Sequence, residues 1–199
     1  GGTPLVSFVK IYFPLTIPGI GAGCLLVFIL AIGYYITPAL VGGAKSYDAA
    51  ILEFDFIPEG DSINFRYVFA SEEYNEFTCS AFNDAFAFFL SGPGFPEQNI
   101  AIIPGTNTPV AINTVNNGTP GFSGSIENCV SLDHPDLFVS NPEGSPDFEY
   151  DGFTVPLAAL VNVVPCQSYH LILAVADAGD GVFDSGVFLE AGSFSSIPE

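Results

Sequence analysis

Basic residues are scarce in this chain, which has 3 Lys and Arg against 22 Asp and Glu and a net charge of −19. A surface this acidic is repelled by phosphate backbones and by anionic lipid, so nucleic acid is excluded as a partner. Histidine is scarce as well, since His134 and His170 are the only two in the sequence. The sequence therefore offers few histidine ligands for a zinc site and few candidates for the base of a Ser-His-Asp triad.

Sequence motifs of common enzymes are also missing. The chain has no GxSxG, no HExxH and no phosphate-binding loop. A pair of carboxylates cleaves a glycosidic bond when the two groups lie about 5 to 10 Å apart, but no pair stands out here from the other acids. We therefore expect a protein that is not an enzyme. A carboxylate-based domain that binds or cleaves glycans is the alternative.

Charge is absent between Lys10 and Lys45, and every acidic residue lies at Asp48 or later. The stretch from Ile17 to Val41 is apolar enough and long enough to span a bilayer as a helix. The alternative is a buried strand or helix of a larger core. This change in composition predicts an apolar segment over residues 1–45 and a separate domain over residues 46–199, with membrane contact only through the first.

From Ser46 onward the apolar residues alternate with polar ones, which is the pattern of half-buried strands. Ile51 to Ile57 and Ser62 to Phe69 are two such strands, separated by the turn sequence PEGD, and we expect them to form a hairpin. The register counted from this turn sets four pairs opposite one another: Phe54 and Phe65, Phe56 and Ile63, Leu52 and Tyr67, and Glu53 and Arg66.

Further strands are predicted at Ala85 to Leu90, Ile100 to Ile103, Val110 to Val115, Thr154 to Val164, Tyr169 to Ala176 and Val187 to Phe194. Gly, Pro and Asn separate these runs, and no helical period is present. The pattern predicts an all-β fold, an antiparallel β-sandwich or jelly-roll-like domain. The strand at 169–176 is apolar on both faces, so we expect it to be central, with His170 in the core. Residues 116–151 are expected to form a long surface excursion.

Two acidic loops interrupt this pattern, one within FASEEYNEFTCSAFNDAFAFF and one reading DAGDGVFDSG. We expect 63–69 to pair with 85–90 and 169–176 to pair with 187–194, so that each loop caps a hairpin. Neighbouring hairpins would bring the acidic side chains together at one end of the sandwich. Calcium takes six to eight oxygen ligands in irregular geometry. The candidate metal ligands are Glu72, Glu73, Asn83, Asp84, Asp177, Asp180 and Asp184. Solvated acidic turns are the alternative.

Three of the four cysteines lie in the acidic part of the chain: Cys79, Cys129 and Cys166. Cys79 is in the first acidic loop, whereas Cys166 precedes the strand that leads to the second loop and so lies at the far end of the sandwich. A strand of that length separates the two ends by roughly 26 Å, beyond disulfide reach. A Cys79–Cys129 disulfide is therefore favoured, and three free thiols are the alternative.

Two parts of the sequence resemble known families. SFVKIYFPLTIPGIGAGCLLVFILAIGYYITPALVGGAK, residues 7–45, is similar to part of the transmembrane domain of an ABC-transporter permease of the polyamine type. The segments FASEEYNEFTCSAFNDAFAFFLSGPG, PVAINTVNNG and PCQSYHLILAVADAGDGVFDSGVFLEAGSF, with AAILEFDFIPEGDSINFRYV, resemble a choice-of-anchor L domain over about residues 48–194. The junction near Ser46 is interpreted in one of two ways. Either the permease-like segment is a natural membrane anchor fused to the module, or two unrelated sequences have been joined by error.

The second resemblance implies a bacterial module that is extracellular or on the cell surface and that serves adhesion or surface structure. Its expected partner is a cell-surface or matrix component, such as a glycan. Permease-like residues stand in place of the module's N-terminal part, which leaves a sheet edge open. An alternative function follows from this edge: residues 5–13 of one copy complete the sheet of the next, giving a homo-oligomer or a surface filament. Pro14, Pro18 and Pro38 disfavour a longer donated strand.

Overall fold

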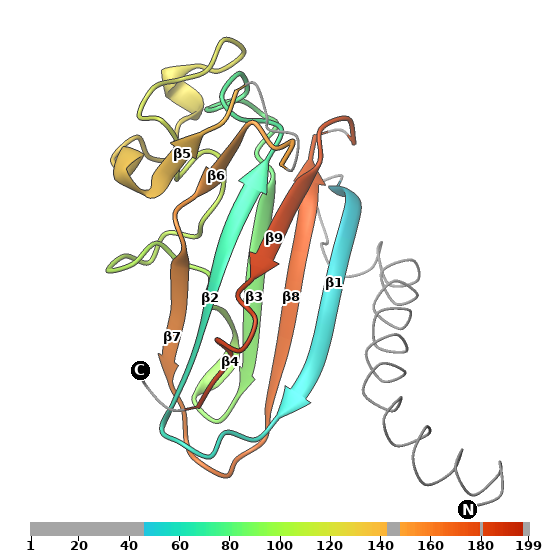
Figure 1. Ribbon diagram of the computed structural model, residues 1–199, viewed down its shortest axis with the longest axis vertical. Helices are drawn as coiled ribbons and strands as arrows, with labels where there is room; N and C mark the ends of the chain where they lie inside the picture. Colours follow the sequence, from blue (N-terminus) through green and yellow to red (C-terminus); the bar gives the residue numbers. More distant parts are fainter. Residues whose placement is uncertain (1–45, 143–147, 180, 197–199) are drawn as a thin grey trace, which may run out of the picture. The chain divides into compact units, whose positions relative to one another are not determined.

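The computed structural model describes residues 46–142, 148–179 and 181–196, all of which belong to a compact unit spanning Thr37–Glu199 (Figure 1). A first unit, Gly1–Ile36, lies outside the described residues. The predicted membrane segment and the predicted donated strand therefore fall outside them as well. Within the described ranges, no helix has the length and apolar character needed to cross a bilayer.

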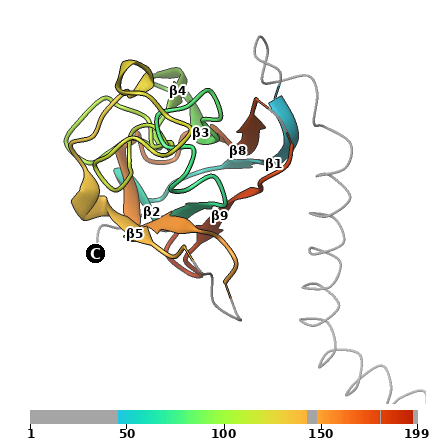
Figure 2. The ribbon, with the colours of Figure 1, turned by 90° about the horizontal axis from the view of Figure 1, so that it is seen from above.

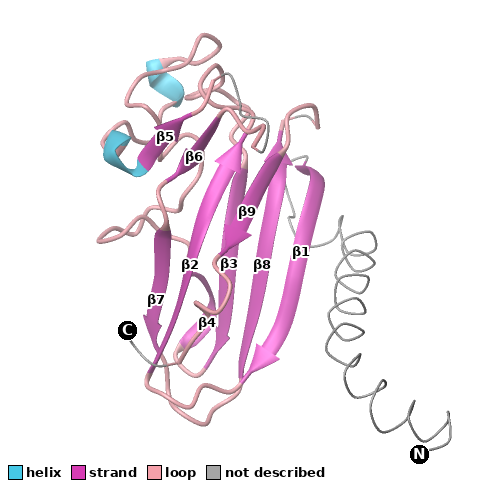
Figure 3. Ribbon diagram, viewed as in Figure 1, coloured by secondary structure: helices cyan, strands magenta, loops and turns pink. Residues whose placement is uncertain are grey.

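The described strands form two antiparallel sheets, which confirms the predicted all-β sandwich (Figure 3). The first sheet has the order β1 (Ser46–Phe56), β8 (Tyr169–Ala178), β3 (Ala85–Gly92) and β4 (Phe95–Asn99). The second has the order β5 (Phe138–Ser140), β6 (Gly152–Thr154), β2 (Ser62–Ser71) and β7 (Leu157–Asn162), and β9 (Ser185–Leu189) pairs with β2. Two 3-10 turns, η2 (Ile126–Asn128) and η3 (Pro135–Leu137), lie before β5. Figure 2 shows the sheets from above as two layers.

Aromatic side chains fill the space between the sheets because every second residue of each strand points inward. Phe65, Tyr67 and Phe69 of β2 are at most 3% exposed, and they meet the buried Phe86 and Phe88 of β3. The ring centroids lie 4.9 Å apart for Tyr67 and Phe88 and 5.0 Å apart for Phe69 and Phe86. The alternation read from the sequence thus identifies the inner faces correctly. As expected, β8 is central, between β1 and β3.

The strand pairing predicted from neighbouring segments is wrong. Strands β1 and β2 lie in different sheets, so Phe54 lies opposite Leu171 and Phe65 lies opposite Ala159. Neither β2 with β3 nor β8 with β9 forms a hairpin, since β3 pairs with β8 and β9 pairs with β2. The physical reason is that a short polar turn such as PEGD serves equally well to carry the chain from one sheet to the other. Side-chain alternation fixes the face of a strand but not its partner.

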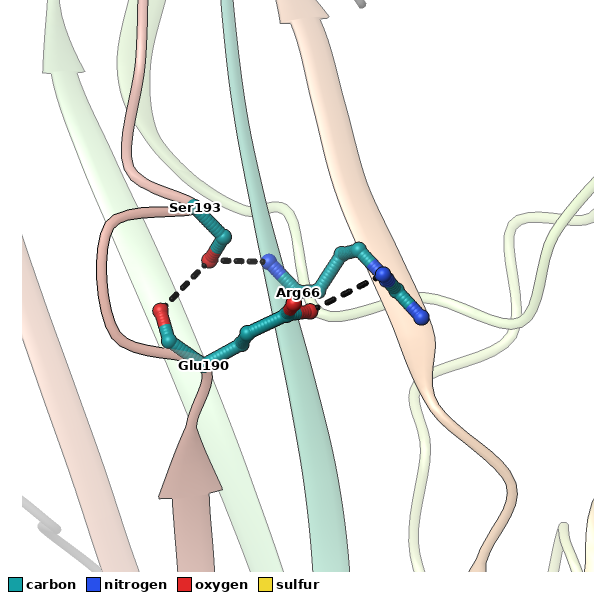
Figure 4. A network of polar contacts seen from close by, with 3 residues as sticks. All are labelled: Arg66, Glu190 and Ser193. Atoms are coloured by element: carbon teal, nitrogen blue, oxygen red, sulfur yellow. Dashed lines mark hydrogen bonds and ion pairs between the residues drawn. The ribbon is translucent and has the colours of Figure 1, made fainter.

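The two charged residues expected to face each other have other partners. Arg66 Nη1 lies 3.0 Å from Glu190 Oε2, and Ser193 Oγ accepts a hydrogen bond of 2.9 Å from the Arg66 amide (Figure 4). Glu53 Oε1 lies 3.2 Å from Nε2 of His170, whose Nδ1 lies 2.9 Å from Asp55 Oδ1. His170 is therefore a partly exposed residue on the outer face of the first sheet, not a core residue as expected.

The strands predicted between β4 and η2 are also absent. Residues 100–103 and 110–115 contain only isolated bridges, such as Ile102 with Pro109, although Ile103, Val110 and Ile112 are buried. Their alternation reflects burial beneath the loops rather than membership of a sheet. Strands β4 and β5 were not foreseen, because Pro96 and the short run FVS give little strand signal.

Candidate functional site

The two acidic loops meet at one end of the sandwich, where both pass from one sheet to the other. The β2–β3 loop begins at Glu72, whose amide donates a hydrogen bond of 3.1 Å to the Asp184 carbonyl oxygen. In return, the Asp184 amide donates a hydrogen bond of 3.2 Å to Glu72 Oε2. The predicted convergence of the loops is therefore present, although it arises from two sheet crossings and not from two hairpins.

Asp84 is the central acid of this end. It is fully buried, and its Oδ1 accepts a hydrogen bond of 2.8 Å from the amide of Ala178. Its Oδ2 accepts another of 2.8 Å from the hydroxyl of Ser185. One carboxylate thus joins the end of β8, the start of β9 and the start of β3. This is a structural role in which both oxygens have a protein donor.

Negative charge accumulates here beneath the surface as well as on it. Glu73 and Asp177 are 2% and 4% exposed, and Asp177 directly precedes Ala178, the residue whose amide donates to the fully buried Asp84. Arg66, in a distant ion pair with Glu190, is the single Lys or Arg among the described residues. A buried carboxylate without a nearby cation is costly unless hydrogen bonds or a bound ion compensate it.

The electrostatic field of these acids extends to the neighbouring segment before β6. Burial, followed by the charges of Asp184, Glu72 and Asp177, raises the pKa of Tyr150. Burial, followed by the charges of Glu76 and Glu72, raises the pKa of Asp151. Both shifts favour the protonated, less negative form, which is the response expected where a group is buried and other acids lie nearby.

The predicted ligands are only partly brought together. Glu72, Asp84 and Asp184 interact across the two loops, directly or through Ser185. The side-chain oxygen of Asn83 instead accepts a hydrogen bond of 2.8 Å from the Asn113 amide. Asp180 lies outside the described residues. Among the residues that are described, no three His, Cys, Asp or Glu side chains converge as a set that would hold a metal ion.

A disulfide ties the long excursion to the first acidic loop. It joins Cys79 to Cys129, the pair that the sequence favours, and Cys166 is free and exposed. Buried Asn113 supports the same junction, because its side-chain oxygen accepts from the Cys79 amide and its Nδ2 donates a hydrogen bond of 2.9 Å to the Ser80 carbonyl oxygen. Sequence reasoning missed Asn113, since a buried asparagine in an irregular segment has no periodic signal.

The excursion then lies against the acidic loop through backbone contacts. The amides of Gly121, Ser123 and Ser125 each donate a hydrogen bond of 2.9 Å, to the carbonyl oxygens of Thr78, Glu76 and Cys79 respectively. A Cβ at Gly121 would overlap the carbonyl oxygens of Asn75 and Glu76, and one at Gly124 would overlap that of Thr78. The two glycines permit this close approach. The two glycines of the GFSG sequence are the feature from which this close approach could have been predicted.

An apolar groove runs along the outer face of the second sheet. It has a volume of about 410 Å³ and is lined by Val68, Asn141, Phe148, Phe153, Thr154, Pro156 and Phe188. A hollow of about 340 Å³ shares Val68, Pro156 and Phe188 with it and leads to the Arg66–Glu190 ion pair. The sequence analysis did not predict this groove, because its walls come from four separate segments.

Two antiparallel sheets joined by two acidic loops, the first of which is tied by a disulfide, define a β-sandwich module. The family model described as "Choice-of-anchor L domain" matches residues 35–195, so the chain belongs to the choice-of-anchor L family. This confirms the resemblance identified from the sequence. No solved structure matches the chain.

A shorter segment is similar to membrane transport proteins. The chain is 50% identical over 46 residues to the spermidine/putrescine transport system permease protein PotB of Escherichia coli (strain K12). The same protein of Haemophilus influenzae is 47% identical over 45 residues. These matches cover 23% of this chain but only 17% and 16% of the two permeases. They confirm the permease-like resemblance of a segment and extend no further.

Proposed function

We propose that this chain is a non-catalytic bacterial module that works outside the cell or on its surface, in adhesion or surface structure, and that calcium stabilises its acidic end. The observation that carries the proposal is the meeting of two acidic, sheet-crossing loops with no Lys or Arg side chain beside them in the described part of the chain. Membership of the choice-of-anchor family and the Cys79–Cys129 disulfide support an oxidising, extracellular setting.

The charge arrangement at this end favours a hard cation. Glu72 and Asp184 are the more exposed acids of the junction, and the buried Asp177 lies in β8, one residue before its end. Carboxylate and backbone carbonyl oxygens on irregular loops are the ligands that calcium uses, and its coordination geometry tolerates rearrangement. Burial is the main reason why the pKa of Asp151 is raised, and a bound cation would offset the smaller contribution that comes from the charges of Glu76 and Glu72. We propose that calcium binding draws these carboxylates together and completes the junction.

A thermal melt of the whole chain with calcium, and again with excess chelator, tests the metal proposal. An ion that binds only the folded state stabilises it by about 2.7 kcal/mol at one hundred times its dissociation constant, so Tm should rise by several degrees. Asp184→Asn should lose most of this rise. Glu59→Gln, an exposed acid in the turn between β1 and β2, is the matched control and should keep it. A melt indifferent to calcium would reduce the acidic loops to solvated turns.

The surface location requires a separate test. Antibodies against the domain should label intact cells of the source bacterium, and mild protease treatment of those cells should remove the label. A protein found only after the cells are broken would contradict the proposed location. This result is independent of calcium, so the two parts of the proposal fail separately.

A further inference from the structure

Asn117 and Gly118 form the single Asn-Gly pair of the sequence, and Asn117 is exposed at the start of the excursion. The backbone nitrogen that follows an asparagine can attack the carbonyl carbon of its side chain and close a five-membered ring. Because the two groups belong to adjacent residues, this attack needs no second molecule. Gly118 has no side chain to hinder it. The hydrogen bonds around the pair therefore decide whether the fold promotes the attack.

Two donors of Thr119 polarise the side-chain carbonyl group of Asn117. Its oxygen, Oδ1, accepts a hydrogen bond of 2.9 Å from the Thr119 amide and another of 2.8 Å from the Thr119 hydroxyl. When a nucleophile adds to the carbonyl carbon, negative charge develops on this oxygen. Two donors that are already in place stabilise that charge in the manner of an oxyanion hole. Thr119 therefore activates the Asn117 amide toward attack.

The attacking nitrogen has a partner of its own. The Gly118 amide donates a hydrogen bond of 3.0 Å to Oδ1 of Asn116. This nitrogen must lose its proton as the new bond forms, and an acceptor on the N–H polarises it in that direction. Asn116 is 1% exposed, and its Nδ2 donates hydrogen bonds of 3.1 Å to the carbonyl oxygens of Ile112 and Ser131. The acceptor is therefore fixed in position.

We propose that Asn117 is a self-modifying site, at which the folded chain converts its own asparagine into aspartate or isoaspartate. The Gly118 nitrogen loses its proton to solvent hydroxide and forms a bond to Cγ of Asn117. The bond from Cγ to Nδ2 breaks, and Nδ2 leaves as ammonia with a proton from water. Water then opens the cyclic imide at either carbonyl carbon, which gives the two products. The sum is one water consumed and one ammonia released, without oxidation or reduction.

The reaction changes a contact between the excursion and the first acidic loop. Asn117 Nδ2 donates a hydrogen bond of 3.2 Å to Oδ1 of Asn75, whose Nδ2 donates one of 2.9 Å to Ser140 Oγ. A carboxylate at position 117 has no donor, so the bond to Asn75 is lost and the acidic chain gains a further negative charge. None of these residues is a proposed calcium ligand, so the site is separate from the proposed metal site.

Mass spectrometry of the peptide that contains residue 117 tests the proposal, after incubation of the folded, full-length chain at mildly alkaline pH. The peptide should gain the mass difference between an amide and a carboxyl group. The exposed Asn107, which precedes Thr108, is the internal control and should keep its amide. Thr119→Val removes the hydroxyl donor and should slow the reaction by about tenfold, less than in an enzyme because this turn is open to water. Thr119→Ser keeps a hydroxyl and should restore the rate.

A comparison in urea separates the effect of the fold from that of the Asn-Gly pair itself. The hydrogen bonds of the turn are absent from the unfolded chain, so the unmodified chain and Thr119→Val should react there at one rate, slower than that of the folded, unmodified chain. The proposal is overturned if the folded chain keeps the Asn117 amide while the unfolded chain loses it. Equal rates for the folded, unmodified chain and folded Thr119→Val also overturn it. Chelator is present throughout, so neither result bears on the proposed metal site.

Discussion

The hydroxyl of Ser185 donates a hydrogen bond of 2.8 Å to Oδ2 of the buried Asp84. Asp84 stands at the start of β3 in one sheet, and Ser185 begins β9 in the other. This contact therefore links the two sheets at the acidic end of the sandwich. We expect it to be among the more valuable polar contacts of the domain, because its acceptor is a carboxyl group that is fully removed from water.

Ser185→Ala should lower the free energy of unfolding by about 1 to 3 kcal/mol, since it leaves one oxygen of Asp84 without its donor. Urea unfolding measures the effect. Ser123→Ala, whose exposed hydroxyl lies on the excursion, is the control and should change stability by less than about 0.5 kcal/mol. Equal stability of Ser185→Ala and the unmodified chain would show that water replaces the hydroxyl at no cost.

Loss of the disulfide should destabilise the domain more strongly. Cys79 and Cys129 are separated by 50 residues, for which the chain-entropy model gives about 4 kcal/mol. Cys129→Ser should therefore shift the urea midpoint well below that of the unmodified chain, and a reductant should do the same. Cys166→Ser, at the free and exposed thiol, should leave the midpoint unchanged. Insensitivity to reductant would mean that the backbone contacts of the excursion suffice.

Gly121→Ala tests the close contact between the excursion and the first acidic loop. The added methyl group would overlap two carbonyl oxygens, so the excursion must move away, at about 1 to 3 kcal/mol. Hydrogen exchange should show faster exchange at the amides of Gly121, Ser123 and Ser125, which lose their bonds to the loop. Unchanged protection of these amides would show that the methyl group fits without displacing the excursion, contrary to the close contact seen at Gly121.

Asp151 should give the domain an unusual dependence on pH. Its pKa in the folded state is raised above the ordinary value of 3.8, so between the two values the folded state binds more protons than the unfolded state. Its contribution to stability is therefore unfavourable at neutral pH, and this cost disappears as pH falls through the raised pKa. Asp151→Asn should raise stability at pH 7 and leave it nearly unchanged in acid, as measured by urea unfolding at both pH values. A uniform loss of stability would identify a structural role for the carboxylate instead.

Periodicity in the sequence predicted most of the strands and their inner faces. Ser62 to Phe69 and Ala85 to Leu90 lie within β2 and β3, and their alternating aromatic residues face the core. Burial of every second side chain produces an alternation of apolar and polar residues that can be read directly from the sequence. The disulfide pair followed similarly from the distance between the two ends of a strand.

The pairing of the strands could not be predicted from this alternation. The register of Phe54 with Phe65 matched apolar residues as well as the observed register of Phe54 with Leu171 does. Both arrangements satisfy the same alternation, so only tertiary packing decides between them. The apolar groove was missed for a related reason, because Phe148, Phe153 and Phe188 are distant in sequence and meet only after the second sheet has formed.

The pairing of β1 with β8 has a consequence for the order of folding. Phe56 lies opposite Tyr169, so the first described strand has its sheet partner near the far end of the domain. The first sheet therefore cannot form before β8 has emerged from the ribosome, and β8 is the second-last of the described strands. Folding of the domain should be slow and should wait for β8, as is general for β proteins dominated by contacts between distant residues. A growing chain that does not yet contain β8 leaves the whole of β1 without its sheet partner.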